Sequence, residues 1–284
     1  MIGFIGGSGV YDALPLENER EEVVETPYGS PSAPVTIGEF GETGTDVAFI
    51  PRHGTHHQYS PTDVPYRANI YALKDLGVKR VLASNAVGSL REDLPPRSLL
   101  VPDQLFDRTR HREQTFFGDG IVVHQSQPDP FCPQLSEHLS AAARAANDVP
   151  VEQGGTYVCI EGPQFSTRAE SEFYREQGWD VVGMTLVPEA KLAREAELCY
   201  ASVTGVTDYD VWKADSEVTL EEVLENAEYN EERIKNAVEA AIRDMPEERT
   251  CGCASALDGA INTPTHAIPE ETLDRVSLLV DDYL

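Results

Sequence analysis

Residues 2–9 read IGFIGGSG, a short apolar run that leads directly into a glycine-rich loop. This pattern is typical of a buried strand followed by a turn that is rich in backbone donors. Similar short runs of β-branched and aliphatic residues recur along the chain. We expect strands at Ile2–Ile5, Asp46–Ile50, Arg80–Ala83, Tyr157–Ile160, Val181–Met184 and Leu198–Thr204.

Amphipathic segments alternate with these apolar runs. They predict helices at Tyr66–Leu76, Pro188–Ala196 and Leu220–Arg243. Strands that alternate with helices predict an α/β fold, here a single domain over 1–284 with a twisted, mixed or largely parallel β-sheet flanked by helices. The tail 251–284 begins irregularly and ends in the apolar run Val276–Val280. We expect this tail to dock at a subunit interface.

The composition limits the classes of partner. The 284 residues include 49 acidic and 22 basic side chains, for a net charge of -27. Such an excess disfavours nucleic acids and anionic membranes as partners, and it resembles the acidic surface of proteins adapted to high salt. We expect neither a signal peptide nor a membrane span. With five cysteines, an odd number, a secreted disulfide framework is not expected, and a cytoplasmic enzyme is.

Polar clusters follow the expected strands repeatedly. Ligands of open α/β sheets bind outside the carboxyl ends of the strands, so these clusters are expected to line one cleft. The clusters are Gly6-Gly7-Ser8-Gly9, Arg52-His53-Gly54, Ser84-Asn85-Ala86, Met184-Thr185 and Thr207-Asp208-Tyr209-Asp210.

The glycine loop and the Arg52-His53 pair together predict an anion site. The loop can offer backbone N–H groups and the Ser8 hydroxyl, while Arg52 adds a fork-shaped cation and His53 a further donor, which suits phosphate. A plain tight turn is one alternative for the loop. A dinucleotide-binding turn is another, but Asp12 stands where its third glycine belongs.

A metal site at the neighbouring histidines is a second alternative to the anion site. His53, His56 and His57 have no carboxylate or cysteine nearby at a spacing typical of metal ligands. We therefore expect no metal at this position.

Asp208 and Asp210 carry the most specific information about a ligand. Residues two apart on an extended strand point the same way, and two adjacent carboxyls do not both ionise readily. One then donates a hydrogen bond and the other accepts, which matches the ring nitrogen and amine of an aminopurine. A 6-oxopurine would leave buried polar groups unpaired, at about 1 to 3 kcal/mol each. A solvated turn or a helix cap is the alternative for this acidic pair.

Taken in order, six segments resemble the purine nucleoside phosphorylase family, and within it the 5′-methylthioadenosine phosphorylase branch. The resemblance covers nearly the whole chain. The segments are Ile2–Gly9, Arg52–Gly54, Asn85–Leu90, Glu161–Glu170, Met184–Glu189 and Thr207–Asp210.

The resemblance implies phosphorolysis of S-methyl-5′-thioadenosine to adenine and 5-methylthioribose 1-phosphate. Inorganic phosphate would be the co-substrate, with no further cofactor and no metal. Asp208 would be the catalytic acid that assists departure of the base. Phosphate would be held by Ser8, Arg52, His53, Asn85, Ala86 and Thr185.

The resemblance also implies how the nucleoside is bound. Phe165 would pack on the purine, Ser166 would help set base choice, and Met184 would lie against the ribose. Asp208-Tyr209-Asp210 would read the base. The 5′ substituent would lie near Leu220, Val223 and Leu224, and a neighbouring subunit of a homotrimer, or of a dimer of trimers, would close the pocket with His124 and Leu279.

Two positions depart from the pattern. Asn85 and Ser8 stand where members that resemble the animal enzymes usually have Thr, and Asn before Ala also occurs in relatives that act on 6-oxopurines. The alternatives are therefore a phosphorylase of inosine, guanosine or methylthioinosine, a hydrolase that uses water, and a non-catalytic nucleoside-binding protein.

The cysteines prompt a separate hypothesis. Cys251 and Cys253 could form a strained bridge, and Cys132 could pair with Cys199. Zinc is not expected there, since the Cys251-Gly252-Cys253 stretch lacks a second pair of ligands in the sequence.

Overall fold

A computed structural model describes residues 1–7, 14–41, 43–213 and 218–284. The predicted phosphate contact of Ser8 lies outside these residues, as does Asp12. None of the helices in the four described stretches combines the length and apolar character needed to cross a lipid bilayer.

The described residues build one mixed sheet of eleven strands, which confirms the expected α/β fold. The bounds of the strands are β1 Ile2–Gly6, β2 Leu16–Glu22, β3 Val35–Phe40, β4 Thr45–Pro51, β5 Arg80–Ser89, β6 Leu99–Val101, β7 Gln104–Asp107, β8 Val151–Gln153, β9 Thr156–Cys159, β10 Val181–Gly183 and β11 Cys199–Asp208. At the centre, β4, β1, β5 and β11 run parallel. The order of hydrogen-bonded neighbours leads from β2 at one edge of the sheet to β7 at the other.

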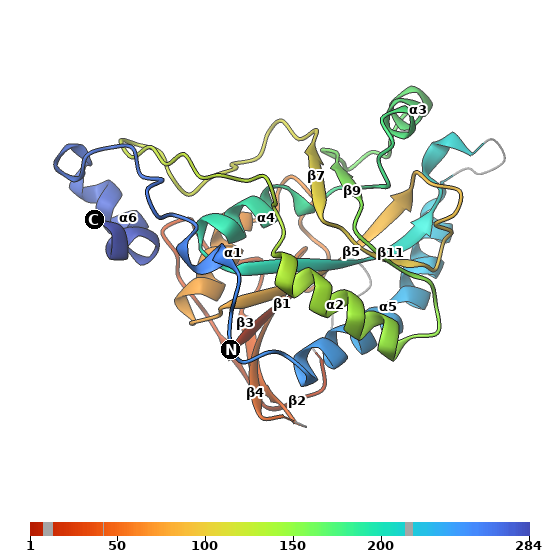
Figure 1. Ribbon diagram of the computed structural model, residues 1–284, viewed down its shortest axis with the longest axis horizontal. Coiled ribbons are helices and arrows are strands. Elements are labelled where there is room, and N and C mark those ends of the chain that lie inside the picture. The colour runs from red at the N-terminus through yellow and green to blue at the C-terminus, as the bar shows by residue number, and fades with distance from the viewer. Residues whose placement is uncertain (8–13, 42, 214–217) are drawn as a thin grey trace.

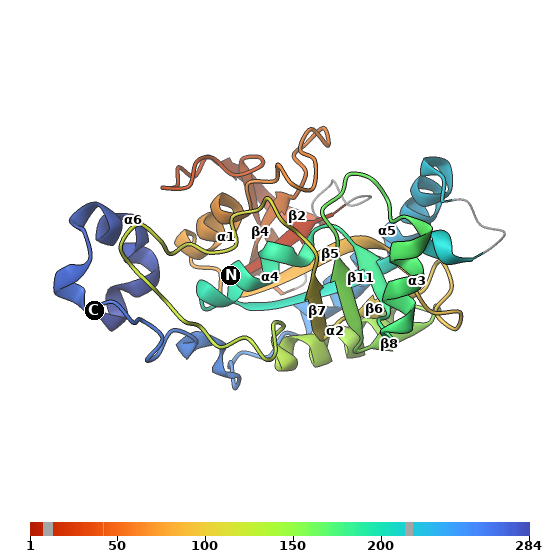
Figure 2. The same cartoon turned by 90° about the horizontal axis from the view of Figure 1, so that it is seen from above.

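Helices cover both faces of this sheet (Figures 1 and 2). Their bounds are α1 Tyr66–Asp75, α2 Pro133–Ala146, α3 Arg168–Glu176, α4 Leu186–Glu195, α5 Leu220–Arg243 and α6 Glu270–Val280. On one face α1 and α4 contribute Ile70 and Leu192 to an apolar core, and on the other α2 and α5 contribute Leu139 and Val238. Burial of such side chains on both faces stabilises the sheet at about 1.5 to 3 kcal/mol per large aliphatic residue.

The six expected strands and three expected helices are present, with bounds shifted by a few residues. The largest shift is in β5, which continues six residues beyond Ala83 to Ser89. Residues 80–83 of β5 pair with β1. On the same side of β5, Gly88 and Ser89 pair with β10. Between these stretches the edge of β5 has neither neighbour, and this open edge faces the functional site described below.

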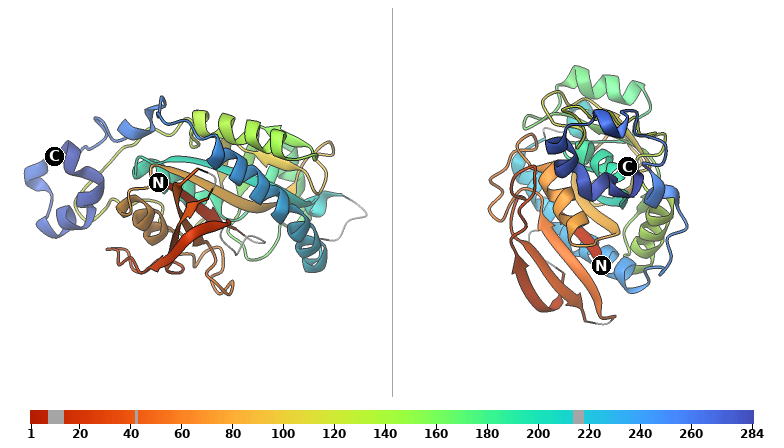
Figure 3. Two further views of the ribbon diagram at one scale, coloured as in Figure 1. Left: turned by 90° about the horizontal axis from the view of Figure 1, so that it is seen from below. Right: turned by 90° about the vertical axis from the view of Figure 1, so that its left-hand side faces the viewer.

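The C-terminal segment crosses the molecule and ends in α6 at one end of it (Figure 3). Short 3₁₀ turns at Gly252–Ser255 and Thr265–Ala267 precede α6. Val276, Leu279 and Val280 are buried within the chain's own core. The apolar pattern of the tail is thus satisfied inside a single chain, and docking of 251–284 on a neighbouring subunit stays a prediction.

The cysteine expectations need correction. All five cysteines are free thiols, so neither suggested bridge is present. The sulfur atoms of Cys132, Cys199, Cys251 and Cys253 nevertheless all lie within 4.8 Å of one another. The expectation that a second pair of ligands is missing near Cys251 and Cys253 is therefore wrong, because the fold brings together sites that are far apart in the sequence.

Candidate active site

A single cavity of about 470 Å³ gathers most of the predicted site residues. Its size falls within the range of small-molecule sites. The cavity lies at the open edge of β5, beside the carboxyl ends of β4, β10 and β11 and the first turns of α5. The predicted residues that line it are Arg52, His53, Asn85, Ala86, Phe165, Ser166, Met184, Thr185, Asp208, Asp210, Leu220, Val223 and Leu224.

The two aspartates meet, but not by the strand alternation expected from the sequence. The register of β11 shifts between Val206 and Asp208, and the strand ends at Asp208. Asp210 then begins a 3₁₀ turn with a left-handed φ of 50°. Its backbone N–H donates to Oδ1 of Asp208 at 2.7 Å. A tight turn therefore sets the spacing of the pair.

Asp208 is a buried carboxyl that accepts hydrogen bonds from its own turn. Thr207 Oγ1 lies 3.1 Å from the carbonyl oxygen of Val87 and 2.7 Å from Asp208 Oδ2. The hydroxyl has one proton and the carbonyl can only accept. The shorter contact is the one to Asp208, whose carboxyl oxygen accepts from the Thr207 hydroxyl. Against these hydrogen bonds, burial raises the pKa of Asp208 above its usual range, which favours the protonated carboxyl.

Asp210 has a free acceptor at the cavity wall. The residue is buried, and its Oδ2 has no hydrogen-bond partner among the described residues. Burial raises the pKa of Asp210, and the charge of Asp208 adds to the effect. The neighbouring hydroxyls of Ser166 and Ser171 oppose this rise in pKa, although neither makes a hydrogen bond of good geometry in the described part of the chain. A buried polar group without a hydrogen-bond partner lowers the free energy of unfolding, which points to a ligand that supplies the missing partners.

The lack of a side chain at Gly88 permits this arrangement. A Cβ atom at this position of β5 would lie 2.8 Å from Asp208 Oδ1 and 3.3 Å from the Cβ of Asp210. Normal carbon–oxygen contacts are longer, so any larger residue would displace the aspartates.

Arg52 differs from the expected free cation. Its side chain is fully buried, and Nε and Nη2 donate to the two carboxylate oxygens of Glu189 at 2.6 and 2.7 Å. Nη1 donates to the carbonyl oxygen of Ser84 at 2.7 Å, and the Tyr200 hydroxyl donates to Glu189 at 2.6 Å. The fork-shaped face thus binds Glu189, and two of the five N–H groups remain for a ligand. Beside Glu189 the pKa of Arg52 is above its usual value despite burial, so the guanidinium stays charged.

His53 lies beside Arg52 in the neutral form. Burial, together with the charge of Arg52, lowers its pKa from 6.5 to about 4. Nδ1 lies 2.9 Å from the carbonyl oxygen of Tyr59, which can only accept, so Nδ1 carries the proton. The other ring nitrogen, Nε2, is then an acceptor. In this tautomer His53 offers an acceptor to a ligand, where the sequence-based expectation was a second donor.

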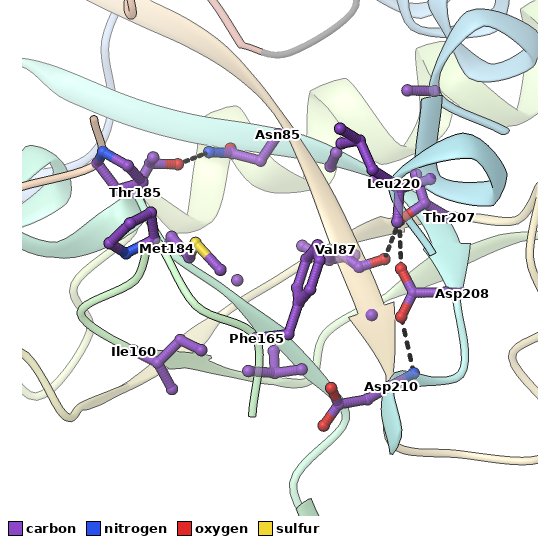
Figure 4. Close-up of a pocket in the computed structure, with 18 of the residues that line it drawn as sticks. Asn85, Val87, Ile160, Phe165, Met184, Thr185, Thr207, Asp208, Asp210 and Leu220 are labelled. Atoms are coloured by element: carbon purple, nitrogen blue, oxygen red, sulfur yellow. Dashed lines mark hydrogen bonds between the residues drawn. The ribbon is translucent and has the colours of Figure 1, made fainter. Parts of the chain in front are cut away.

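Asn85 and Thr185 form a polar pair on the opposite side of the cavity from the aspartates (Figure 4). The Asn85 amide donates to the Thr185 hydroxyl, and its oxygen accepts from Ser202. Because Ser202 fixes the amide orientation, the second N–H of Asn85 is available in a defined direction. This pair lies at the open edge of β5, beyond the stretch of β5 that pairs with β1.

Apolar side chains separate the two polar ends and form the rim. Figure 4 shows Phe165 and Val87 between the Thr185 side and the aspartates, with Leu220 above them. Phe165, Leu220 and Leu224 are 45%, 65% and 55% exposed. Large apolar side chains exposed at a cavity mouth indicate a surface that a ligand or another chain covers.

Three predicted residues lie elsewhere. Tyr209 is outside the cavity lining, with its ring against Trp212, and its assignment to substrate binding stays a prediction. His124 is exposed, and its backbone N–H donates to Ala260. Leu279 is 4% exposed, because it packs inside its own chain, and so it offers little surface to a neighbouring subunit. Any contact of His124 or Leu279 across an interface stays a prediction.

Sequence reasoning missed two buried charged residues that hold the site. Glu189 ends a recognised motif, but its partner Arg52 is 137 positions away. Arg112 donates to the carbonyl oxygens of Met184 and Val187, both at 2.6 Å, and to that of Glu161 at 2.7 Å. The only available signal for Arg112 was a basic cluster at 108–112 in a chain that is poor in basic residues.

Comparisons with known proteins agree with this geometry. A family model described as the phosphorylase superfamily matches residues 1–243. S-methyl-5′-thioadenosine phosphorylase of Pyrococcus horikoshii is 53% identical over 258 residues, which are 90% of this chain and 97% of that protein. A crystal structure of methylthioadenosine phosphorylase from an Antarctic soil metagenomic library superposes with a TM-score of 0.92 at 44% identity, covering 98% of each chain.

A structure with a bound nucleoside is also similar. It is a variant of adenosine/methylthioadenosine phosphorylase from Schistosoma mansoni in complex with methylthioadenosine, and it superposes with a TM-score of 0.79 at 38% identity. The similarity covers 87% of this chain and 92% of that one. On the family match and the extent of these similarities, the chain belongs to the phosphorylase superfamily.

Proposed function

We propose that this protein catalyses phosphorolysis of S-methyl-5′-thioadenosine to adenine and 5-methylthioribose 1-phosphate. The observation that carries the proposal is the pair Asp208 and Asp210, two buried carboxyl groups at one end of a largely apolar cavity. The names of the similar proteins support the same substrate.

The acidic pair supports an aminopurine as the base. Protonated Asp208 would donate to the imidazole-ring nitrogen N7, and the free Oδ2 of Asp210 would accept from the exocyclic amine. Phe165 would cover the face of the ring. A 6-oxopurine would place its carbonyl oxygen against the acceptor of Asp210, which disfavours inosine and guanosine.

The opposite end of the cavity supports phosphate. Asn85 and Thr185 offer oriented donors there, and Arg52 has two N–H groups left. Hydrogen phosphate carries one P–OH group, and neutral His53 offers an acceptor for it at Nε2. Donors to the charged oxygens and an acceptor for the hydroxyl together would favour the dianion HPO₄²⁻.

The sugar would lie between the two ends, against Met184. Its 5′ group would then reach Leu220, Val223 and Leu224, where a methylthio group gains from apolar burial and a hydroxyl does not. The exposed Leu220 and Leu224 fit a pocket that a second subunit completes, and we propose a homotrimer or a dimer of trimers on this basis.

In the reaction the bond from C1′ to N9 breaks, and its electron pair stays with the purine. Asp208 stabilises the negative charge that develops on the purine by donating its proton towards N7. At the same time positive charge develops on the sugar. Phosphate, held on the face of the sugar opposite the base, stabilises the positive charge on the sugar and attacks C1′. Overall, HPO₄²⁻ supplies the proton that adenine carries away, and the sugar leaves as its phosphate monoester.

Release of free base tests this function. Methylthioadenosine, adenosine, methylthioinosine and inosine are each supplied with and without phosphate, in high-salt buffer. We expect phosphate-dependent release of adenine, fastest from methylthioadenosine. Faster release from the inosines would contradict the base assignment, and release without phosphate would contradict the phosphate site.

Asp208→Asn tests the role of the acid directly. The amide keeps the size of the side chain but cannot supply the proton, so we expect turnover to fall by about 100-fold or more. Wild-type turnover in a folded variant would exclude Asp208 as the acid.

A further inference from the structure

Four cysteines from three separate parts of the chain converge far from the cavity. Cys132 precedes α2, Cys199 begins β11, and Cys251 and Cys253 lie in the turn after α5. Three of them are buried and Cys251 is partly exposed. The phosphorylase chemistry proposed above uses none of them.

The sulfur positions match one tetrahedral site. All four sulfur atoms lie within 4.8 Å of one another, and the Cys199 and Cys251 sulfurs are 3.4 Å apart. A zinc ion with Zn–S bonds of about 2.3 Å holds four sulfurs about 3.8 Å apart. The four cysteines thus form one compact cluster around a common centre, and only small movements are needed to fit the ion.

We propose that Cys132, Cys199, Cys251 and Cys253 bind one structural zinc ion. Four protein ligands close the coordination sphere, as in structural sites, whereas catalytic zinc keeps a position for water or substrate. Cys199 and Asp208 stand at opposite ends of β11, and nine residues of strand span about 30 Å. The ion therefore takes no part in the reaction at the cavity.

The surroundings suit a site with negative charge. Four thiolates and one Zn²⁺ carry a net charge of about -2, with the thiol protons released to solvent. Arg249, two residues before Cys251, donates to the carbonyl oxygens of Lys79 and Glu197. The backbone of Cys199 donates to the same Lys79 carbonyl. Cys132 also stands at the N-terminus of α2, where the helix dipole favours anionic sulfur.

The apolar neighbours exclude water from the ion. Cys132, Cys199 and Cys253 belong to the core that packs between the sheet, α2 and α5, together with Leu135 and Ile242. A zinc ion there would fasten the segment after α5 to both β11 and α2. Loss of the ion is therefore expected to loosen the C-terminal segment from the core.

Two disulfides are the competing fate of four adjacent cysteines. Disulfides would divide the sulfurs into two bonded pairs, whereas the structure has four free thiols in one cluster. The two outcomes differ in metal content and in thiol count, so one preparation of the full-length protein distinguishes them.

The experiment measures zinc per chain by elemental analysis, and free thiols in denaturant with chelator, both without reductant. We expect one zinc per chain and five thiols, since Cys159 is free as well. One free thiol and no zinc would overturn the proposal in favour of two disulfides. Five thiols and no zinc after dialysis against zinc would also overturn it.

Variants locate the ion. Cys251→Ser changes the least buried ligand, and we expect zinc affinity at least ten-fold below that of the wild type. Cys159→Ser is the matched control, because this cysteine lies in β9 outside the cluster, and it is expected to keep one zinc per chain. Wild-type zinc affinity in Cys251→Ser, or loss of zinc from Cys159→Ser, would refute the assignment.

Cobalt supplies a readout that does not depend on activity or folding yield. Co²⁺ bound by four thiolates is expected to give intense sulfur-to-metal charge-transfer absorption and the visible bands of a tetrahedral ion. These bands are expected in the wild type and in Cys159→Ser. Octahedral cobalt spectra in the wild type would overturn the tetrathiolate site.

Discussion

Glu195 makes the stability of this protein depend on pH near neutrality. The residue ends α4, is 7% exposed, and accepts hydrogen bonds from the Thr115 hydroxyl and the Phe116 N–H at 2.7 and 2.8 Å. Burial raises the pKa of its carboxyl from 4.5 to about 7. The folded state therefore holds a proton at this position that the unfolded chain releases at lower pH.

The sign and size of the effect follow from proton linkage. The contribution of protonated Glu195 to the free energy of unfolding is fully present below pH 4.5, and it is lost as the pH rises through about 7. Each pKa unit corresponds to about 1.4 kcal/mol, so the whole effect is about 3 kcal/mol. Between about pH 5.5 and about pH 8.5, about 2 kcal/mol of it should be lost. This range avoids the isoelectric point near 4.5, where the protein would precipitate.

The assay is urea unfolding at fixed salt and fixed protein concentration across this pH range. Glu195→Gln keeps the size and the acceptor but cannot ionise. We expect the free energy of unfolding of the wild type to fall by about 2 kcal/mol relative to Glu195→Gln as pH rises. Glu172→Gln, at an exposed position of α3, removes one charge from the surface and is expected to follow the wild type. Parallel profiles for the wild type and Glu195→Gln would refute the reasoning.

Three further substitutions test the cavity. Gly88→Ala places a Cβ 2.8 Å from Asp208 Oδ1, so we expect slower base release and a loss of about 1 to 3 kcal/mol in stability, measured by turnover and thermal unfolding. Asp210→Ala should reduce the preference for amino- over oxopurines by about ten-fold or more, and an unchanged ratio of kcat/KM would contradict its role. Glu189→Ala leaves Arg52 buried without its partner and should cost about 3 to 5 kcal/mol in urea unfolding, whereas a cost below about 1 kcal/mol would show the pair to be solvated.

The parallel centre of the sheet could be predicted from the sequence. Its strands are buried on both faces and therefore appear as continuous apolar runs. β2 could not be predicted in this way, because LENEREE has no apolar alternation and forms a strand by pairing with β3. α3 had a local signal that was not used, since Thr167 and Glu170 form a capping box at its start.

The chemistry of the site was only partly visible in the sequence. Asp208 and Asp210 were recognised, but the turn that joins them depends on a register shift that no local pattern encodes. Arg52 was taken for a free cation, because its pairing with Glu189 needs the tertiary fold. The same holds for the four cysteines, whose positions span 132 to 253.

The edge strand β2 constrains how copies of this chain can associate. Among the described residues β2 has a strand neighbour on one side alone, and on its other side the sheet of another molecule could otherwise continue the hydrogen-bonded ladder. Glu17, Glu19, Glu21 and Glu22 stand along this strand. A second copy aligned there would bring like charges to within a few ångströms, so stacking of sheets into aggregates is opposed at this edge. The proposed oligomer is therefore expected to use other surfaces, such as the apolar rim formed by Leu220 and Leu224.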